Sequence, residues 1–132
     1  MSYASKFGLD DFELYKAARR FRVKSYQLIR QLPNEEKYCL GTQMRRAAVS
    51  VSNNVAEGHG RWHYQDNIRF CLFSRGSVEE LVDDFNVCLD EHYGDEQYAE
   101  ELKVDAQQLI AKINSYIAYL RRSKQGEQSD DG

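Results

Sequence analysis

Apolar residues recur at intervals of three and four along most of the chain, which is the spacing of one buried face of an α-helix. The first such stretch begins near Asp10 and ends before Pro33, because proline cannot continue a helix. Asp10 and Glu13 have the spacing of a capping box, and Leu9 and Leu14 have that of a hydrophobic staple. The predicted inner face of this helix consists of Leu14, Ala18, Phe21, Ser25, Leu28 and Leu32.

A second helix is predicted from Asn34, a good N-cap residue, to about Glu57. Its apolar stripe consists of Leu40, Met44, Ala47, Ala48, Val51 and Val55. A third helix is expected over roughly residues 65 to 92, with an inner face of Ile68, Leu72, Val78, Val82, Phe85 and Leu89. A fourth begins after Gly94 and carries the most regular stripe of the chain, which is Leu102, Ala106, Leu109, Ile113, Tyr116 and Leu120.

The links between these four stretches are short, so consecutive helices should be antiparallel neighbours. The pattern therefore predicts an all-α fold, an antiparallel up-down-up-down four-helix bundle that occupies residues 1 to 122 as a single domain. Residues 123 to 132 contain no apolar side chain and are predicted to form a disordered acidic tail.

Glycines mark two places that an ordinary helix does not need. Gly58 and Gly60 flank His59 and indicate the end of the second helix and a loop after it. Gly76 and Ser77 lie in the middle of the third helix, where such a pair costs about 1 kcal/mol in helix propensity relative to alanine. We expect either a close helix approach or a kink there.

Composition fits this prediction, since 132 residues contain only one proline and eight glycines. The formal charge of −3 hides an uneven distribution: residues 1–62 carry 11 Lys and Arg against 6 Asp and Glu, and residues 63–132 carry 7 against 15. Such a division indicates a nucleic-acid face, an acidic partner, or two halves that attract each other. Three widely separated cysteines, Cys39, Cys71 and Cys88, are expected to be buried free thiols.

The chain has no apolar stretch long enough for a membrane span, and its first residues lack a basic segment followed by an apolar one. A cytoplasmic protein that does not contact membranes is the resulting prediction. Catalytic motifs are missing as well: no glutamate stands three residues before any of the three histidines, and no nucleophile or phosphate-loop motif occurs. His59 and His63 are four residues apart, but glycines flank His59. We therefore expect neither an enzyme nor a bound metal or cofactor.

Polar residues gather on the second and third helices, and two interpretations of them stay open. In the first, an arginine of the second helix pairs with Glu80 and fixes the register of the two helices. In the second, arginines of this region belong to a basic surface that contacts phosphates. That candidate nucleic-acid-binding surface consists of Arg19, Arg20, Arg22, Lys24, Arg45, Arg46 and Arg61.

Four separated motifs carry a family resemblance: Leu32-Pro33, the run from Gln43 to Val51, the run from Asn54 to Arg61, and Gly76-Ser77-x-x-Glu80-Leu81. In this order they resemble the four-helix bundle proteins encoded in intervening sequences of 23S ribosomal RNA genes. The same family resembles the accessory variability determinant of diversity-generating retroelements. The matching signature positions, most of them expected to be structural, are Arg45, Arg46, Asn54, Glu57, Gly58, Gly60, Arg61, Gly76, Ser77 and Glu80.

The resemblance implies a bundle that assembles as a homopentamer and has no enzymatic activity. It also implies binding of RNA or DNA, and partnership with a reverse transcriptase in the retroelement members. Those members are strongly basic, whereas this chain has a pI near 5.6. The alternative function is therefore a structural or protein-interaction scaffold that does not bind nucleic acid.

Overall fold

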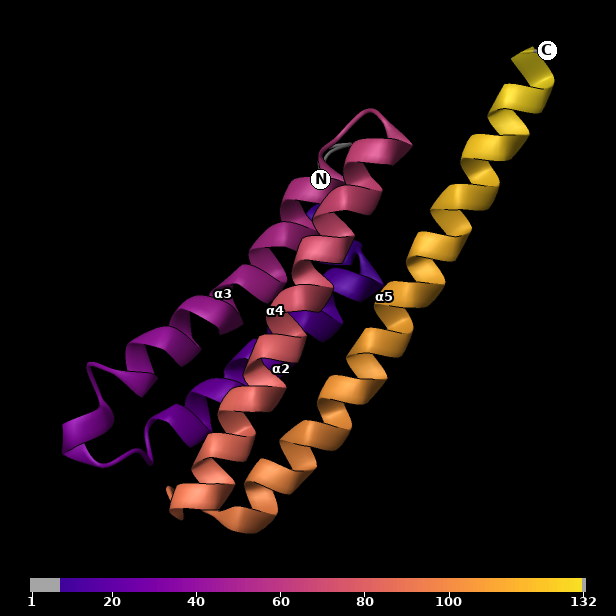
Figure 1. Cartoon of the computed structure of the whole chain (residues 1–132). Helices are drawn as coiled ribbons and strands as arrows, with labels where there is room; N and C mark the ends of the chain where they lie inside the picture. The colour runs from indigo at the N-terminus through magenta and orange to yellow at the C-terminus, as the bar shows by residue number, and fades with distance from the viewer. Residues whose placement is uncertain (1–7, 132) are drawn as a thin grey trace.

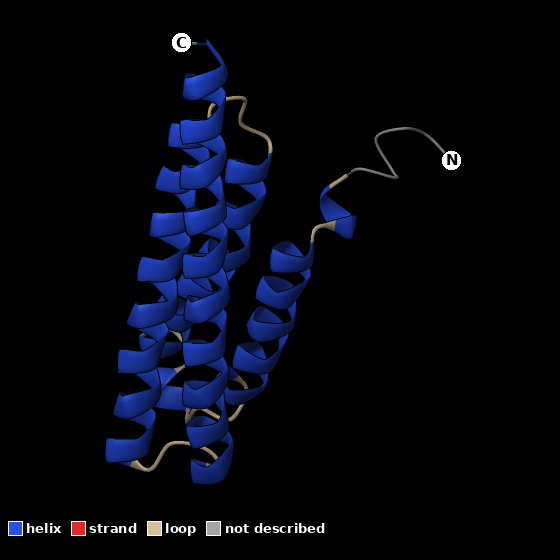
Figure 2. Cartoon of the chain, turned by 90° about the vertical axis from the view of Figure 1, so that its right-hand side faces the viewer, coloured by secondary structure: helices blue, strands red, loops and turns tan. Residues whose placement is uncertain are grey.

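The computed structural model describes the backbone of residues 8–131 and the side chains of residues 8–123. In this part of the chain four α-helices follow one another and no strand occurs (Figures 1 and 2). The helices are α2 (Glu13–Ile29), α3 (Leu40–His59), α4 (Tyr64–Glu91) and α5 (Glu96–Asp131), with two short 3-10 turns, η1 (Leu9–Asp11) and η2 (Asn34–Glu36). Each helix packs on its neighbours in sequence, and α5 returns to α2. The predicted all-α four-helix bundle is confirmed.

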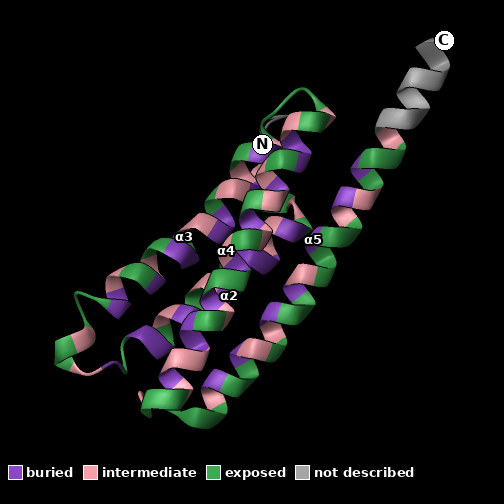
Figure 3. Ribbon diagram, viewed as in Figure 1, coloured by how far each residue is buried: buried purple, intermediate pink, exposed green. Residues whose placement is uncertain are grey.

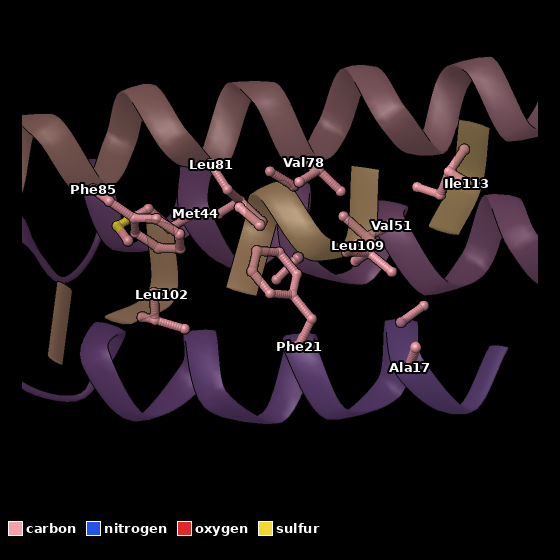
Figure 4. Packing of buried hydrophobic residues seen from close by; sticks show 14 of the residues in the cluster. Ala17, Phe21, Met44, Val51, Val78, Leu81, Phe85, Leu102, Leu109 and Ile113 are labelled. Atoms are coloured by element: carbon pink, nitrogen blue, oxygen red, sulfur yellow. The ribbon is translucent and has the colours of Figure 1, made fainter. Parts of the chain in front are cut away.

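The core runs along the bundle between all four helices, and the buried stripes are visible on their inner faces (Figure 3). Every residue of the predicted stripes of α2 and α3 is buried. Near the middle, the ring of Phe21 on α2 meets that of Phe85 on α4 edge to face, with their centroids 6.3 Å apart. Met44 and Leu102 bring α3 and α5 to the same layer (Figure 4). Burial of these apolar surfaces is the main stabilising contribution to a fold of this kind.

The beginnings of the first two helices differ from the prediction. Asp10 lies in the 3-10 turn η1, and the N-cap of α2 is Phe12, which makes no side-chain cap. The ring of Phe12 instead stacks on His59, with centroids 4.7 Å apart. Asn34 starts the turn η2 rather than an α-helix, and α3 begins only at Leu40. At the start of α2 a ring contact thus stands in place of a side-chain cap.

The inner face of α4 is turned by about one residue from the predicted stripe. Its buried residues are Asn67, Ile68, Cys71, Ser74, Val78, Leu81, Asp84, Phe85 and Cys88. Leu72, Val82 and Leu89, which the prediction placed in the core, are only partly buried. The prediction followed large aliphatic side chains, whereas the actual face includes five small or polar ones, Asn67, Cys71, Ser74, Asp84 and Cys88. It is these residues that let α4 approach its neighbour α3 closely.

One other expectation is wrong, and a second falls largely outside the described side chains. Cys39 is exposed, although Cys71 and Cys88 are buried, and burial raises the pKa of each buried thiol to about 11. The predicted disordered tail at 123–132 lies almost entirely outside the residues whose side chains the structure describes. Helix α5 extends to Asp131. Among the described residues, no helix has the length and apolar character that crossing a membrane requires.

Candidate nucleic-acid interface

Signature positions of the sequence lie largely where α3 and α4 pack against each other. A Cβ atom on Gly58 would stand 2.7 Å from Asn67 Oδ1 and 3.1 Å from Phe70 Cβ, so only glycine allows this approach. The hydroxyl of Ser74 donates a 2.7 Å hydrogen bond to the carbonyl oxygen of Val51 across the same interface. Small residues therefore bring the two backbones together here.

A polar ladder continues along the outer edge of the same helix pair. The hydroxyls of Ser77 and Ser50 are 2.8 Å apart, and Asn54 Nδ2 donates to the carbonyl oxygen of Ser50 at 2.9 Å. These hydrogen bonds connect Ser50, Asn54 and Ser77, which all lie in the sequence motifs described above. They hold α3 and α4 in register and explain Ser77 and Asn54 as structural residues.

Asp84 is a residue of this interface that the sequence analysis missed. It is 1% exposed, its Oδ1 accepts a 3.0 Å hydrogen bond from Gln43 Nε2, and its Oδ2 has no partner in the described part of the chain. Burial raises the pKa of Asp84 to about 6, with smaller contributions from the nearby carboxylates of Glu80 and Asp83. Its position on the buried face of α4, three residues after Leu81, was the available sequence signal.

Arginines of the predicted basic surface serve several different purposes. Arg22 Nη1 donates a 2.8 Å hydrogen bond to the buried hydroxyl of Ser52, which ties α2 to α3. Arg45 Nη2 donates to the carbonyl oxygen of Lys37 at 3.1 Å, at the start of α3. Arg61 pairs with Glu57 at 3.2 Å and lies over the ring of Phe70. Arg22, Arg45 and Arg61 therefore have local structural contacts at separate places in the bundle.

The expected pairing of an arginine of the second helix with Glu80 is wrong. Glu80 has no ion-pair partner within the described residues, and neither has Arg46, which is exposed on α3. Gly76 also differs from expectation: a Cβ atom built on it would meet nothing within 4 Å. Close helix approach among the described residues therefore does not account for that glycine. The hydrogen bonds of Ser77 to Ser50 and of Ser74 to Val51 connect α3 and α4 and fix their register instead.

Helix α2 holds the largest uninterrupted group of positive charges. Residues 14–34 contain six Lys and Arg and no Asp or Glu. Of the predicted site residues, Arg19 and Arg20 are exposed and Lys24 is partly exposed, and all three border one depression on this helix together with Lys16 and Val23. These three residues are the part of the predicted surface that the structure brings together.

A groove runs beside this basic stretch, between α2 and α5. Its middle part, of about 210 Å³, has an apolar floor that includes Phe21 and Leu109. Its larger continuation, of about 480 Å³, reaches Phe12 and Tyr116 near the N-terminal end of α2. Figure 2 shows this end of α2 standing apart from the other helices. Arg20 borders both parts of the groove and also the depression on α2.

Charges along the groove are only partly compensated. Lys24 Nζ pairs with Asp105 of α5, a hydrogen bond that raises the pKa of the lysine. Lys16 pairs with Glu13 at 3.3 Å. Arg20 and Lys112, which face the groove from its two sides, have no hydrogen-bond or ion-pair partner among the residues described. Two unpaired cations thus border an apolar floor, an arrangement that suits an anionic ligand with flat apolar parts.

Residues 8–123 contain no group of three or more His, Cys, Asp or Glu side chains that could hold a metal ion. The groove and the basic face of α2 form the candidate site of this helical bundle.

The model of the family described as 23S rRNA-intervening sequence protein matches residues 10–115. This match covers most of the chain, from the turn before α2 to the middle of α5, and the chain belongs to that family. No curated protein gives a significant match.

Proposed function

We propose that this protein is a non-catalytic, oligomeric adaptor that associates with nucleic acid through the outer face of α2 and the groove between α2 and α5. The observation that carries the proposal is the pair of uncompensated cations, Arg20 and Lys112, beside a helix face without any acidic residue. Positive side chains free of protein partners can release the counterions of phosphates, which drives nucleic-acid binding. The family description, which names 23S rRNA, agrees with this direction.

An overall charge of −3 does not oppose the proposal, because the acidic residues concentrate elsewhere. The two loops at the far end of the bundle, between α2 and α3 and between α4 and α5, are flanked by Glu35, Glu36, Asp90, Glu91, Asp95 and Glu96. Exposed charges farther apart than a Debye length of about 8 Å are largely screened at physiological salt. The acidic residues that line the groove beside Arg20 are Asp105, which pairs with Lys24, and Glu13, which pairs with Lys16.

The test compares two exposed cations. Arg20→Glu reverses a charge at the groove, and Lys37→Glu reverses a charge in the link between α2 and α3 that has no ion-pair partner among the described residues. Binding of the purified protein to a structured RNA and to duplex DNA is measured across a salt series. We expect Arg20→Glu to weaken binding roughly fivefold or more and to reduce the salt slope by about one, and Lys37→Glu to change both little. Equal effects of the two variants would place the contact elsewhere, and absence of wild-type binding at low salt would reject the proposal.

Self-assembly forms the second part of the proposal, and the outer strip of α3 and α4 supports it. Phe73 is 52% exposed, Gly76 has open space in front of it, and Arg46 and Glu80 are a cation and an anion without partners in the described residues. In a head-to-tail contact the cation of one protomer faces the anion of the next, and heterologous contacts of this kind close into rings. A ring of five such protomers, as the family resemblance implies, would repeat the α2 face and bind by avidity.

Light scattering tests this part directly. We expect the wild type to have a mass several times 15.4 kDa, and Gly76→Leu or Phe73→Glu to reduce it to that of the monomer while circular dichroism stays helical. A wild-type monomer would contradict the proposed assembly. The protein partner of such an adaptor, a reverse transcriptase in the retroelement members that the family resembles, stays a prediction.

The alternative function, a scaffold that does not bind nucleic acid, is favoured by the same strip of α3 and α4. The two functions share the assembly and differ only at the groove. An oligomer that binds neither RNA nor DNA at low salt would support the scaffold.

A further inference from the structure

The wall of the groove on α5 presents positive charge and aromatic rings in one line. Lys112, Tyr116 and Tyr119 are spaced four and three residues apart, so they lie on one face of the helix. At 1.5 Å per residue, Lys112 and Tyr119 are about 10 Å apart along the axis. An elongated ligand that lies along this face therefore meets a cation first and an aromatic platform next.

The aromatic platform is held in place by contacts beneath it. Tyr116 lines the groove, and its hydroxyl accepts a 3.1 Å hydrogen bond from Asn67 Nδ2 of α4. The ring of Tyr116 packs against that of Phe12 at a centroid distance of 5.0 Å. The ring of Tyr119 stacks on that of Tyr116, with centroids 6.0 Å apart and an interplanar angle of 26°. Tyr119 is 54% exposed. The fixed ring of Tyr116 thus supports the exposed ring of Tyr119. This support lowers the entropy cost of ordering Tyr119 when a ligand binds.

The remaining charges around the groove are largely compensated within the protein. The acidic residues that line it are Asp105, paired with Lys24, and Glu13, paired with Lys16. Arg20 and Lys112 are the cations of the groove lining that remain without such a partner in the described chain. The uncompensated charge is positive, and it lies next to the apolar floor rather than on a flat polar surface.

We infer that this groove binds single-stranded nucleic acid, with phosphates at Arg20 and Lys112 and an unstacked base on Tyr119. The inference rests on the proposed function and specifies its ligand. A duplex keeps its bases stacked inside and offers only its backbone and groove edges, so it gains nothing from Tyr119 or from the apolar floor. A single strand presents the faces of its bases, and positive grooves with aromatic platforms are how proteins bind it without sequence preference.

The experiment measures fluorescence anisotropy of labelled oligo(U), oligo(dT) and a DNA duplex of the same length, each titrated with the full-length protein across a salt series. We expect the single strands to bind at least tenfold more tightly than the duplex. Tyr119→Ala should remove most of that preference, since stacking on one aromatic ring contributes about 1–3 kcal/mol. Tyr119→Phe keeps the ring and should retain the preference.

Controls separate stacking from general effects of losing a tyrosine or a charge. Tyr38→Ala removes an 85% exposed tyrosine near the opposite end of the bundle and should leave binding unchanged. Lys112→Glu should weaken binding of the single strands and lower their salt slope by about 0.7, the value for one phosphate contact. Circular dichroism verifies that each variant is folded.

The outcomes distinguish this inference from the function on which it depends. Equal affinity for single strand and duplex, unaffected by Tyr119→Ala, overturns the inference and leaves nucleic-acid association standing. Absence of binding to every nucleic acid overturns both. Direct binding of a labelled polyglutamate peptide, without binding of oligonucleotides, would assign the groove to an acidic polypeptide and also overturn the inference.

Discussion

The two antiparallel helix pairs of this bundle are built in contrasting ways. Helices α3 and α4 share the most extensive contacts, and glycine and serine at their interface let the backbones approach until a single Cβ on Gly58 would collide. Helices α2 and α5 have less contact, and long cationic side chains such as Arg20 and Lys112 border an open groove between them. One pair fixes the fold, and the other leaves surface for a ligand.

This contrast explains why signature residues and candidate binding residues separate in space. Side-chain size sets how close two helices come, because interaxial distances follow the residues at the contact. Small residues close the interface of α3 and α4 around Gly58 and Ser74. A motif-rich stretch of sequence therefore marks the packing interface here, and the candidate binding groove lies at helices with fewer motifs.

The largest expected effect breaks the close packing of α3 on α4. Gly58→Ala places a methyl group against Asn67 and Phe70 and should lower the free energy of unfolding by about 2 kcal/mol, as overpacking does. Urea unfolding followed by circular dichroism measures it. Gly60→Ala is the matched control, since its nearest contact is 3.8 Å and it should stay within about 0.5 kcal/mol of the wild type. Equal destabilisation by the two variants would contradict the proposed role of Gly58.

The next effect concerns the buried carboxyl at the same interface. The folded-state pKa of Asp84, about 6, lies above the unfolded value near 4, so between these pH values the folded protein keeps a proton that unfolding releases. Stability should therefore fall as pH rises from about 4 to about 6, by about 3 kcal/mol. Urea midpoints across this pH range measure the slope.

Asp84→Asn should remove most of that pH dependence and raise stability at pH 8, because it eliminates a buried charge. Asp90→Asn, at an exposed position of α4 that does not contribute to the raised pKa of Asp84, is the control and should keep the wild-type slope. A pH profile of Asp84→Asn that runs parallel to the wild type would refute the assignment.

A smaller effect on stability distinguishes the side of α2 that packs on α3, where Arg22 lies, from the side that faces the groove, where Arg20 lies. Arg22→Ala removes the hydrogen bond to buried Ser52 and should cost about 1 kcal/mol of stability. Arg20→Ala, two residues earlier and without a partner in the described chain, should change stability by less than about 0.5 kcal/mol. Thermal unfolding compares the two. If Arg20→Ala lowered stability more than Arg22→Ala, Arg20 would have to make a stabilising contact within the protein, which would contradict its proposed role as an uncompensated cation.

Much of the fold could be predicted from the sequence, since periodicity located four helices and the stripes of α2 and α3 exactly where burial is found. The stripe of α4 was only half right, because its inner face includes Ser74 and Asp84, which hydropathy assigns to the surface. Of the predicted basic residues, Arg19, Arg20 and Lys24 came together, whereas Arg22 and Arg45 turned out to bind protein groups.

The sequence by itself determined the helices, because the spacing of apolar residues specifies one buried face for each of them. It also placed a run of positive charge on α2 with no acidic residue between Leu14 and Asn34. Only the tertiary structure decided which cations are compensated, since the partners of Lys24 and Arg22 are 81 and 30 residues away along the chain. The groove, too, depends on Lys112 and Tyr116 of α5 lying beside Arg20 and Phe12 of α2, a proximity that no local pattern encodes.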